Sequence, residues 1–297
     1  MQVVSSLVRV VVLLKYVSDV TQARSLDQGR MVRDPAQGVL NEPDEHALEA
    51  ALRLVEAAQA REQVPAGLEQ APEHTQGSHE IIAVTMAPDG GDIAIKKAYQ
   101  LGATRGIRLS DPALAGSDYF GTTAALSAVI RKLGEQAPID LVITGMASLD
   151  GLGGVIPALL AEDLGWPQLT HATSVDFAPD NPQALAVVRK TDDVICQLQA
   201  PLPALVAVTD AANSIRTPNF ALIMAARKSP VEQWTYADIE PYLDQGVGQE
   251  AARTTVVSAS PHPPRPPARM VTDSLDSQGR SSGGQALADY LISNDLV

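Results

Sequence analysis

A glycine-rich turn is the first feature of the sequence that could do chemistry. Asp150-Gly151-Leu152-Gly153-Gly154 follows an apolar segment, residues 139–144, and precedes the helical pattern of residues 156–164. Glycines leave backbone amides without side-chain cover, and the positive end of a helix dipole favours an anion beside them. The turn therefore predicts a phosphate site, although the same glycines would also serve a tight strand-to-helix connection and nothing more.

The residues around this turn limit the kind of phosphate that it would hold. The glycine spacing matches neither the dinucleotide-binding fingerprint nor the Walker loop with its lysine and hydroxyl pair. Between Gly145 and Glu162 the sequence has no lysine or arginine, so a triphosphate would be poorly neutralised. We therefore expect a monophosphate held chiefly by backbone amides. Because ligands of open parallel sheets lie beyond the carboxyl ends of the strands, the loops 15–20 and 86–91 join the candidate site.

Side chains suited to catalysis are sparse. His171 has no glutamate or cysteine at metal-ligand spacing, so we expect a structural histidine whose polar atoms are satisfied. Cys196, the only cysteine, lies in an alternating apolar segment and is expected to be a small buried residue. Residues 281–284, Ser-Ser-Gly-Gly, resemble a phosphate loop but follow no strand, and we expect a flexible joint there.

Alternating strand and helix patterns must position these residues. Apolar runs typical of strands covered on both faces alternate with segments of helical spacing. This alternation predicts a parallel sheet with helices on both faces and right-handed crossovers. Residues 62–79 show no periodicity and are expected to be a surface loop. The predicted strands are residues 8–14, 81–86, 107–109 and 138–145, and the predicted helices are residues 47–55, 93–101, 119–133 and 156–164.

The pattern changes near residue 170, where apolar and polar residues begin to alternate. Residues 174–177, 184–188, 194–198 and 204–208 predict hairpin strands that add antiparallel partners to the sheet. Together with the first half, they predict a three-layer α/β/α fold with a mostly parallel sheet and antiparallel additions.

The composition shifts again beyond residue 250. The proline run 261–267 must be extended, because proline lacks the amide hydrogen that a helix or a sheet requires, and residues 285–292 predict a short helix. We therefore expect a nucleotide-binding domain, residues 1–250, and an extended C-terminal arm, residues 251–297. The arm would contact a second chain or remain disordered.

Composition excludes several classes of function. A net charge of −13 without a basic stripe argues against nucleic acid, whose phosphates bind clustered lysine and arginine. The apolar run 7–14 is far shorter than the roughly 20 residues that span a bilayer, and no cleavage site follows it, so we expect no direct membrane insertion. A single cysteine permits no internal disulfide and fits a reducing cytoplasm.

Several segments resemble the β subunit family of electron-transfer flavoproteins, in its actinobacterial form. Residues 13–17, Leu-Leu-Lys-Tyr-Val, are similar to the family's first strand and lysine-containing turn, and residues 39–45 to the turn that opens its next helix. Residues 150–171 resemble its nucleotide loop and helix. The most specific match is Pro-Leu-Pro-Ala-Leu-Val at 201–206, followed by Ile-Met-Ala-Ala-Arg-Lys at 223–228.

This resemblance implies an electron-carrier subunit without catalytic residues of its own. It implies a heterodimer with an α subunit that holds most of the FAD, and a structural AMP in this chain. It also implies electron exchange with flavin-dependent dehydrogenases, such as acyl-CoA dehydrogenases, and with a quinone-linked acceptor. The implied AMP contacts are Leu13, Asn41, Glu42, Pro43, Asp44, Met86, Gly145, Met146, Ala147, Ser148, Leu149, Asp150, Gly151, Leu152, Gly153, Gly154, Val155 and Ile156.

The segment between Asn213 and Lys228 is implied to recognise the redox partners. Its candidate contacts are Asn213, Arg216, Phe220 and Met224. Phe220 matches the family's apolar anchor, and an aromatic side chain in a complementary pocket is a physically reasonable centre of binding energy. The alternative is that Phe220 packs inside its own chain.

Three other functions remain open at this point. A bifurcating variant would carry a second FAD in this chain in place of AMP. A stand-alone nucleotide-binding protein of the universal-stress type would share the parallel α/β layout but would not explain the arm or the segment 213–228. A hydrolase or ATP pyrophosphatase would need catalytic side chains around the glycine turn, where Asp150 is the one candidate.

Overall fold

The computed structural model describes residues 8–19, 21, 25–27, 30–33, 37–62, 79–260, 263, 267, 268 and 270–297. The chain divides into two compact units, Met1–Ser258 and Ala259–Val297. Nearly all of the predicted loop 62–79, and most of the proline run 261–267, lie outside the described residues.

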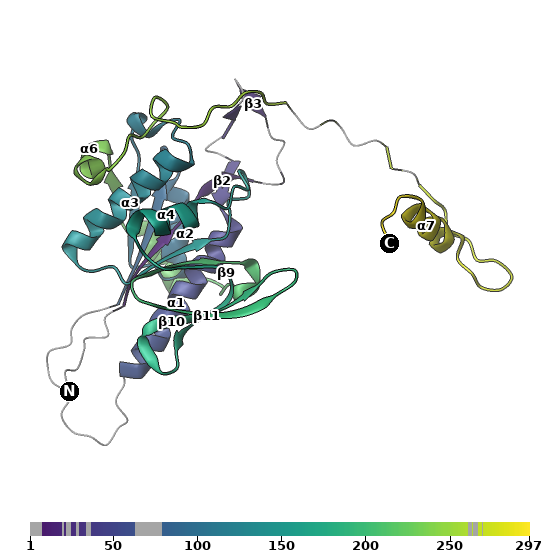
Figure 1. The fold of residues 1–297 in the computed structure, drawn as a ribbon, viewed down its shortest axis with the longest axis horizontal. Coiled ribbons are helices and arrows are strands. Elements are labelled where there is room, and N and C mark those ends of the chain that lie inside the picture. The colour runs from purple at the N-terminus through teal and green to yellow at the C-terminus, as the bar shows by residue number, and fades with distance from the viewer. Residues whose placement is uncertain are drawn as a thin grey trace, which may run out of the picture. The chain divides into compact units, whose positions relative to one another are not determined.

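A nine-stranded sheet forms the centre of the larger unit (Figure 1). Its strands are β1 (Arg9–Leu13), β6 (Glu80–Met86), β7 (Arg105–Leu109), β8 (Leu141–Gly145), β9 (Gln168–Ala178), β10 (Asn181–Lys190), β11 (Ile195–Pro201), β12 (Ala204–Val208) and β13 (Glu232–Trp234). They are ordered β11-β10-β9-β12-β8-β1-β6-β7-β13. From β9 to β13 every neighbouring pair is parallel, whereas β10 is antiparallel to β9 and β11. The prediction of a mostly parallel sheet with antiparallel additions is confirmed.

One strand differs from its prediction. β12 does not form an antiparallel hairpin but lies between β8 and β9, parallel to both. All five of its residues are buried. Continuous burial is typical of a parallel strand covered by helices on both faces, and the uninterrupted apolar run Ala-Leu-Val-Ala-Val is the signal for it.

Helices cover both faces of the sheet, which confirms the three-layer architecture (Figure 1). On one face, α1 (Glu42–Glu62) and α2 (Asp92–Leu101) pack against the side chains of Val10, Val12 and Ile143. On the other face, α3 (Tyr119–Gln136) and α4 (Ile156–Leu164) pack against Val11 and Val142. Successive residues of a strand point to opposite faces, so the near-continuous apolar runs supply both cores. No helix in the described part of the chain is long and apolar enough to cross a membrane.

Short elements complete the larger unit. They are β2 (Tyr16–Ser18), paired with β5 (Gly38–Leu40); β3 (Leu26–Asp27), paired with β4 (Arg30–Met31); α5 (Phe220–Lys228); α6 (Tyr236–Ile239); and the 3-10 helices Pro112–Leu114, Asp210–Ala212 and Glu240–Tyr242. The sequence patterns predicted neither α5 nor the edge strand β13, because both are too short to show a clear period.

The smaller unit contains α7 (Ser282–Ser293), which begins before the predicted residue 285. The Ser281 hydroxyl caps it by accepting from the Gly284 amide at 2.8 Å. The Ser-Ser-Gly-Gly segment is therefore a helix start and not a flexible joint. None of the residues of α7 is buried.

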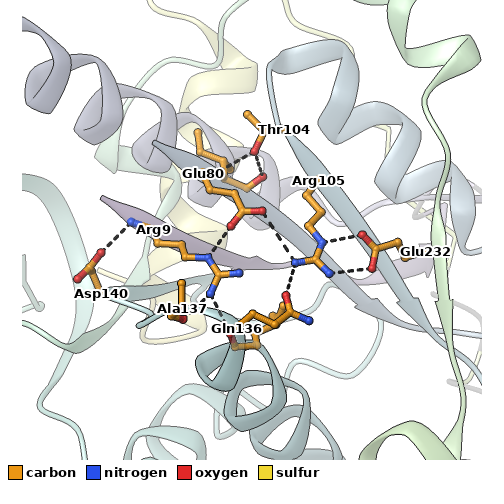
Figure 2. Close-up of polar contacts among 10 residues, drawn as sticks. Arg9, Glu80, Thr104, Arg105, Gln136, Ala137, Asp140 and Glu232 are labelled. Atoms are coloured by element: carbon orange, nitrogen blue, oxygen red, sulfur yellow. Dashed lines mark hydrogen bonds and ion pairs between the residues drawn. The ribbon is translucent and has the colours of Figure 1, made fainter. Parts of the chain in front are cut away.

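Charged side chains join the amino ends of the central strands (Figure 2). Arg9, at the start of β1, is 5% exposed. Its Nε lies 2.5 Å from Glu80 Oε2 at the start of β6, and its Nη1 donates to the carbonyl oxygens of Leu133 and Ala137 at the end of α3. Asp140 accepts from the Arg9 amide at 2.8 Å. A cation suits this place because carbonyls at a helix C-terminus carry partial negative charge.

A second arginine extends this amino-edge network (Figure 2). Arg105, at the start of β7, makes a two-pronged contact with Glu232 of β13, with Nε–Oε1 and Nη2–Oε2 distances of 2.6 and 2.8 Å. It also donates to Gln136 Oε1 at 2.7 Å. The hydrogen bonds that Arg105 donates to Glu232 raise its pKa, and this effect is larger than the opposite effect of burial. The network therefore fastens the edge strand β13 to the centre of the sheet.

Candidate functional site

The glycine turn lies at the carboxyl edge of the sheet, as the sequence predicts. Gly145 ends β8, and its amide donates to Asp44 Oδ1 at 3.3 Å. The other oxygen of Asp44 accepts from the Lys15 amide at 2.7 Å. A Cβ built on Gly145 would lie 2.5 Å from Asp44 Oδ1 and 2.7 Å from the Pro43 carbonyl carbon, so only glycine fits there. The first turn of α1 thus contacts the ends of both β1 and β8.

Asp44 is a fully buried carboxyl group. Burial raises its pKa to about 7, although hydrogen bonds from Asn41 and from the amides of Lys15 and Gly145 act in the opposite direction. Near neutral pH this carboxyl is therefore poised between its two protonation states. Desolvation is the main cause of this raised pKa, because burial disfavours the charged form of a carboxyl group.

Asn41 fixes the next part of the loop. Its side chain is 1% exposed. Nδ2 donates to the Ala147 carbonyl at 3.1 Å, and Oδ1 accepts from the Leu149 amide at 2.9 Å. The Asn41 amide in turn donates to the Lys15 carbonyl at 2.9 Å. The Asn41 side chain thereby supplies hydrogen-bond partners to loop backbone groups that would otherwise bond to water.

Two cations that are distant in sequence meet at Asp150. Lys15 Nζ lies 2.7 Å from Asp150 Oδ1 and also donates to Ser148 Oγ at 3.1 Å. Arg33 donates through Nε and Nη2 to Asp150 Oδ2 at 3.0 and 2.7 Å. Burial alone would raise the pKa of Asp150, but these hydrogen bonds and charges hold it at about 2.

This cluster corrects an inference from the sequence. We judged the turn to be short of positive charge, because its own segment has no lysine or arginine. The structure supplies both cations from other segments, and their side chains are 41% and 47% exposed while that of Asp150 is 1% exposed. Two cations shared by one carboxylate leave a formal surplus of one positive charge beside the turn.

The backbone between Asp150 and α4 is sharply bent, and the Leu152 amide donates to the Ser148 carbonyl at 2.8 Å. Leu152 and Gly154 have positive φ angles of 49° and 62°. Gly153 passes close to Tyr119 at the start of α3, since a Cβ there would lie 2.4 Å from the tyrosine hydroxyl. Val155 precedes α4 and provides no side-chain cap for its first amides. An anion at this helix start would satisfy donors that the protein leaves to solvent.

The remaining predicted contacts gather at the same edge. Leu13 ends β1 and Met86 ends β6, and β1 lies between β8 and β6 in the sheet. Leu13 is buried and Met86 partly buried, while Glu42 at the start of α1 is exposed. The structure therefore brings together, around three adjacent strand ends, residues that span the sequence from 13 to 156.

One buried hydroxyl near the turn went unnoticed in the sequence. Thr144 precedes Gly145 and is 6% exposed, and its Oγ1 has no hydrogen-bond partner in the part of the chain that the structure describes. By strand alternation it faces the same side of the sheet as Val142, the side covered by α3 and α4. A buried hydroxyl without a partner is costly, so it points to a group that the chain itself does not supply.

A cavity of about 440 Å³ lies beside the turn rather than in it. His171 lines it, is exposed, and has a positive φ of 56°, so the prediction of a satisfied structural histidine is wrong. The bulge that carries His171 is held by Arg189 Nε, which donates to the Thr170 carbonyl at 2.7 Å, and by the Thr209 amide. The cavity is lined by Met146, His171, Thr173, Lys190, Thr191, Asp192, Thr209 and Asp210.

The segment 213–228 is fastened to α1 at its beginning. Asn213 exchanges two contacts with His46, Oδ1 to Nδ1 at 3.0 Å and Nδ2 to the carbonyl oxygen at 2.9 Å. Arg216 contacts Glu49 and Glu56, with nearest distances of 2.7 and 2.6 Å. The hydrogen bonds that Arg216 donates to Glu56 and Glu49 raise its pKa.

The rest of this segment presents apolar side chains to solvent. Phe220 is 78% exposed and Met224 40% exposed, and within α5 only Ala226 is buried. The alternative that Phe220 packs inside its own chain is therefore wrong. Exposed aromatic and methionine side chains on a short, firmly held helix are typical of a contact surface.

Comparison with known proteins defines the class. Residues 61–239 match the family model of the electron transfer flavoprotein domain. The chain is 34% identical over 290 residues to the electron transfer flavoprotein subunit beta of Mycobacterium tuberculosis and to that of Mycobacterium leprae, in alignments covering 97% of this chain and 99% of each relative. The chain belongs to the electron-transfer flavoprotein β subunit family, and this confirms the resemblance seen in the sequence.

More distant relatives carry other names. Protein FixA of Azorhizobium caulinodans is 31% identical over 232 residues, 77% of this chain and 75% of the relative. The caffeyl-CoA reductase-Etf complex subunit CarD of Acetobacterium woodii is 26% identical over 265 residues, 89% and 92% of the two chains. Membership in the electron-transfer flavoprotein family identifies electron transfer as the general function of this chain.

Proposed function

We propose that this chain is the β subunit of a heterodimeric electron-transfer flavoprotein, with a structural AMP at its glycine turn and FAD held mainly by an α subunit. It relays electrons from flavin-dependent dehydrogenases to a quinone-linked acceptor in the cytoplasm and has no catalytic residues of its own. The observation that carries the proposal is the convergence of the glycine turn, the uncapped start of α4 and two half-exposed cations at one edge of the sheet.

The residues at this edge suit a nucleoside monophosphate. The amides of Gly153 and Gly154 and the surplus charge of Lys15 and Arg33 would hold a phosphate, which needs donors and modest neutralisation. Leu13 supplies apolar surface at the neighbouring strand end, and the unpartnered Thr144 hydroxyl offers a polar contact. AMP in this role would be structural, because the residues that would hold it belong to the ends of β1 and β8 and to the start of α4.

FAD supplies the electron-transfer chemistry when it is bound, and this chain supplies contact surfaces. We assign recognition of redox partners to the segment that starts at Asn213 and presents Phe220 and Met224. Arg216 holds that segment against α1, so α5 is presented from a fixed base. We assign contact with the α subunit to the C-terminal arm, residues 251–297, whose helix α7 leaves Leu287 and Tyr290 exposed.

The nucleotide assignment is tested by isolating the heterodimer and identifying what it releases. Mass spectrometry of denatured complex should find one AMP and one FAD. Gly145→Ala should lower the AMP content at least several-fold, because the new methyl group meets Asp44 and Pro43. Gly134→Ala is the matched control, since a Cβ at that helical position meets nothing within 4 Å. Full AMP content in the Gly145 variant would contradict the assignment.

The partner surface is tested separately by electron transfer from a purified acyl-CoA dehydrogenase. Phe220→Ala should raise the KM for the carrier about tenfold, the equivalent of about 1.4 kcal/mol, with stability almost unchanged. Ile195→Ala, at another solvent-exposed apolar residue, in β11, is the control. Equal KM values for the two variants would show that Phe220 does not contribute to recognition of the redox partner.

One observation favours a second candidate, the bifurcating variant with FAD in this chain. The largely open cavity that Met146 lines adjoins the loop of the glycine turn, and a ligand larger than a mononucleotide could extend into it. Two FAD and no AMP per heterodimer in the same mass-spectrometric experiment would select this variant. Membership in the flavoprotein family removes the stand-alone universal-stress alternative.

A further inference from the structure

The last segment of the larger unit before the C-terminal arm continues packs against the start of α3. We call residues 245–254 the arm root. The Gly248 amide donates to Ser117 Oγ at 2.8 Å. Gly248 has a φ of +80°, and a Cβ there would lie 2.3 Å from the Ala113 carbonyl oxygen. A Cβ on Gly116 would lie 2.5 Å from Gln249 Oε1, so the two backbones touch at glycines on both sides.

Asp118 is the centre of this contact. Its Oδ1 caps α3 by accepting from the amides of Phe120 and Gly121 at 3.0 and 3.1 Å. Its Oδ2 accepts three hydrogen bonds from the arm root: the Arg253 amide at 2.7 Å, the Thr254 amide at 2.9 Å and the Thr254 hydroxyl at 3.0 Å. One carboxylate therefore fixes a helix start and the end of the arm root at the same time.

Arg253 adds a contact of a different kind. Its guanidinium carbon lies 4.8 Å from the centroid of the Phe120 ring, and its Nη2 donates to Gln245 Oε1. A guanidinium over the face of an aromatic ring is attracted by the ring's electrons, so this contact also holds the arm root. Beyond Thr254 the chain makes a sharp change in character, because Val256 and Val257 are 64% and 95% exposed. Arg253 and Thr254 are therefore the last residues of the arm root that contact Asp118.

We propose that Asp118 is a positioning residue for subunit assembly: it clamps the arm root onto α3 and so fixes the point from which the C-terminal arm reaches the α subunit. This inference rests on the proposed function, in which the arm contacts that subunit. An arm that starts from a fixed point samples a smaller volume than a loosely attached one. The effective concentration of the arm at the α subunit therefore rises. Five hydrogen bonds on one partly buried carboxylate are otherwise more than a helix cap requires.

The test measures the dissociation constant for the purified α subunit with three full-length variants. Asp118→Ala removes the cap and the clamp. Thr254→Pro removes the amide and hydroxyl donors of residue 254 and leaves the α3 cap in place. Asp111→Ala is the matched control, because Asp111 also caps a helix, at the Ala113 amide, and also holds a distant segment, at the Tyr236 amide, but does not touch the arm root.

We expect Asp118→Ala and Thr254→Pro each to weaken binding of the α subunit about tenfold, the equivalent of 1.4 kcal/mol, and Asp111→Ala to change it less than twofold. The AMP content should stay the same in all three. Equal binding by wild type, Asp118→Ala and Thr254→Pro would overturn the inference, and so would equal weakening by Asp111→Ala.

A fourth variant separates this inference from the proposed function. A chain that ends at Ser258 keeps the larger unit, which contains both hydrophobic clusters. If it binds the α subunit as tightly as the full chain, the arm has no role in assembly and the proposed function fails on that point. If the truncation weakens binding while Asp118→Ala and Thr254→Pro do not, the arm matters and the clamp does not.

Discussion

The two edges of the central sheet both carry buried charge, but they use it differently. At the amino edge, Arg9 is 5% exposed and donates to a carboxylate and to two carbonyl oxygens of α3. At the carboxyl edge the buried group is the carboxylate, Asp150, and the cations Lys15 and Arg33 are nearly half exposed. The Arg9 cluster hides its positive charge, and the Asp150 cluster displays it.

This difference separates a structural cluster from a binding site. Arg9 and Arg105 are surrounded by acceptors of the chain, so no further anion is needed to neutralise them. The cluster at Asp150 has a formal surplus of one positive charge beside a helix start whose amides have no side-chain cap. Strand ends of open parallel sheets bind ligands at the carboxyl edge, and the charge distribution gives a physical reason for that rule here.

The largest predicted effect is at the amino edge. Arg9→Met should lower the free energy of unfolding by about 3 kcal/mol, because it leaves Glu80 and the end of α3 without their buried donor. The AMP content of the folded heterodimer should not change. Urea denaturation of the variant measures the first quantity and mass spectrometry the second.

Arg33→Met is the matched control at the other edge. Its side chain is 47% exposed, so its loss should cost less than about 1 kcal/mol of stability while AMP retention falls. If the two arginine variants lost equal stability, the contrast between a structural and a binding edge would be wrong.

The next largest effect is a pH dependence that originates at Asp44. Burial raises its pKa to about 7 from an ordinary value of 3.8, so the folded chain binds a proton that the unfolded chain has lost. This contribution to stability is complete below pH 4 and disappears as the pH rises through 7. Between pH 5 and pH 7 it should lower the free energy of unfolding by about 2 kcal/mol.

The variant Asp44→Asn isolates this contribution. Its stability should be lower than that of wild type at pH 5 but should vary less between pH 5 and pH 7, because the titrating group is gone. Asp150 does not interfere, since its pKa of about 2 confines its contribution to more acidic pH. Identical pH profiles of the two proteins would show that Asp44 does not titrate in this range.

Asp150→Ala should have a smaller effect on stability and a clear effect on the ligand. Its partners are half exposed, so the cost should be about 1 kcal/mol. Lys15 and Arg33 would lose their common anchor, and AMP should be released about tenfold more readily, a loss of roughly 1.4 kcal/mol in binding. Dialysis followed by mass spectrometry of the remaining nucleotide measures this. Unchanged AMP retention would show that the cations do not depend on Asp150 for their position.

The sequence predicted the backbone elements of this site better than the charged side chains that surround it. The glycine turn after residues 139–144 and the helix after it could be placed because their signals are local: an apolar run, glycines and a helical period. The resemblance also named Asn41 and Asp44. Their role in holding the turn could not be seen, since it depends on strands β1 and β8 lying side by side.

What the sequence could not supply were contacts between distant segments. Arg33 precedes the turn by more than a hundred residues, and no pattern near Gly145 points to it. The antiparallel prediction for β12 failed for a similar reason: a strand's partners are set by the whole sheet, whereas the local pattern shows only its period. His171 was misjudged because its bulge and positive φ arise from the pairing of β9 with β10 and β12.

The smallest expected change in stability is at Thr144. Thr144→Val keeps the volume of the side chain and removes a buried hydroxyl that has no partner in the described residues, so stability should stay within about 0.5 kcal/mol of wild type or rise slightly. AMP retention should nevertheless fall several-fold, since the hydroxyl lies under the turn on the α4 side of the sheet.

Thr85→Val provides the comparison within the same carboxyl edge. Thr85 is fully buried, its Oγ1 also has no partner among the described residues, and it precedes Met86 at the end of β6. By strand alternation it shares a face with Ala83, the face covered by α1 and α2, opposite to Thr144. Its replacement should leave AMP retention unchanged. Equal AMP loss in both variants would mean that the effect comes from the strand ends in general, and Thr144 would lose its assignment as a ligand contact.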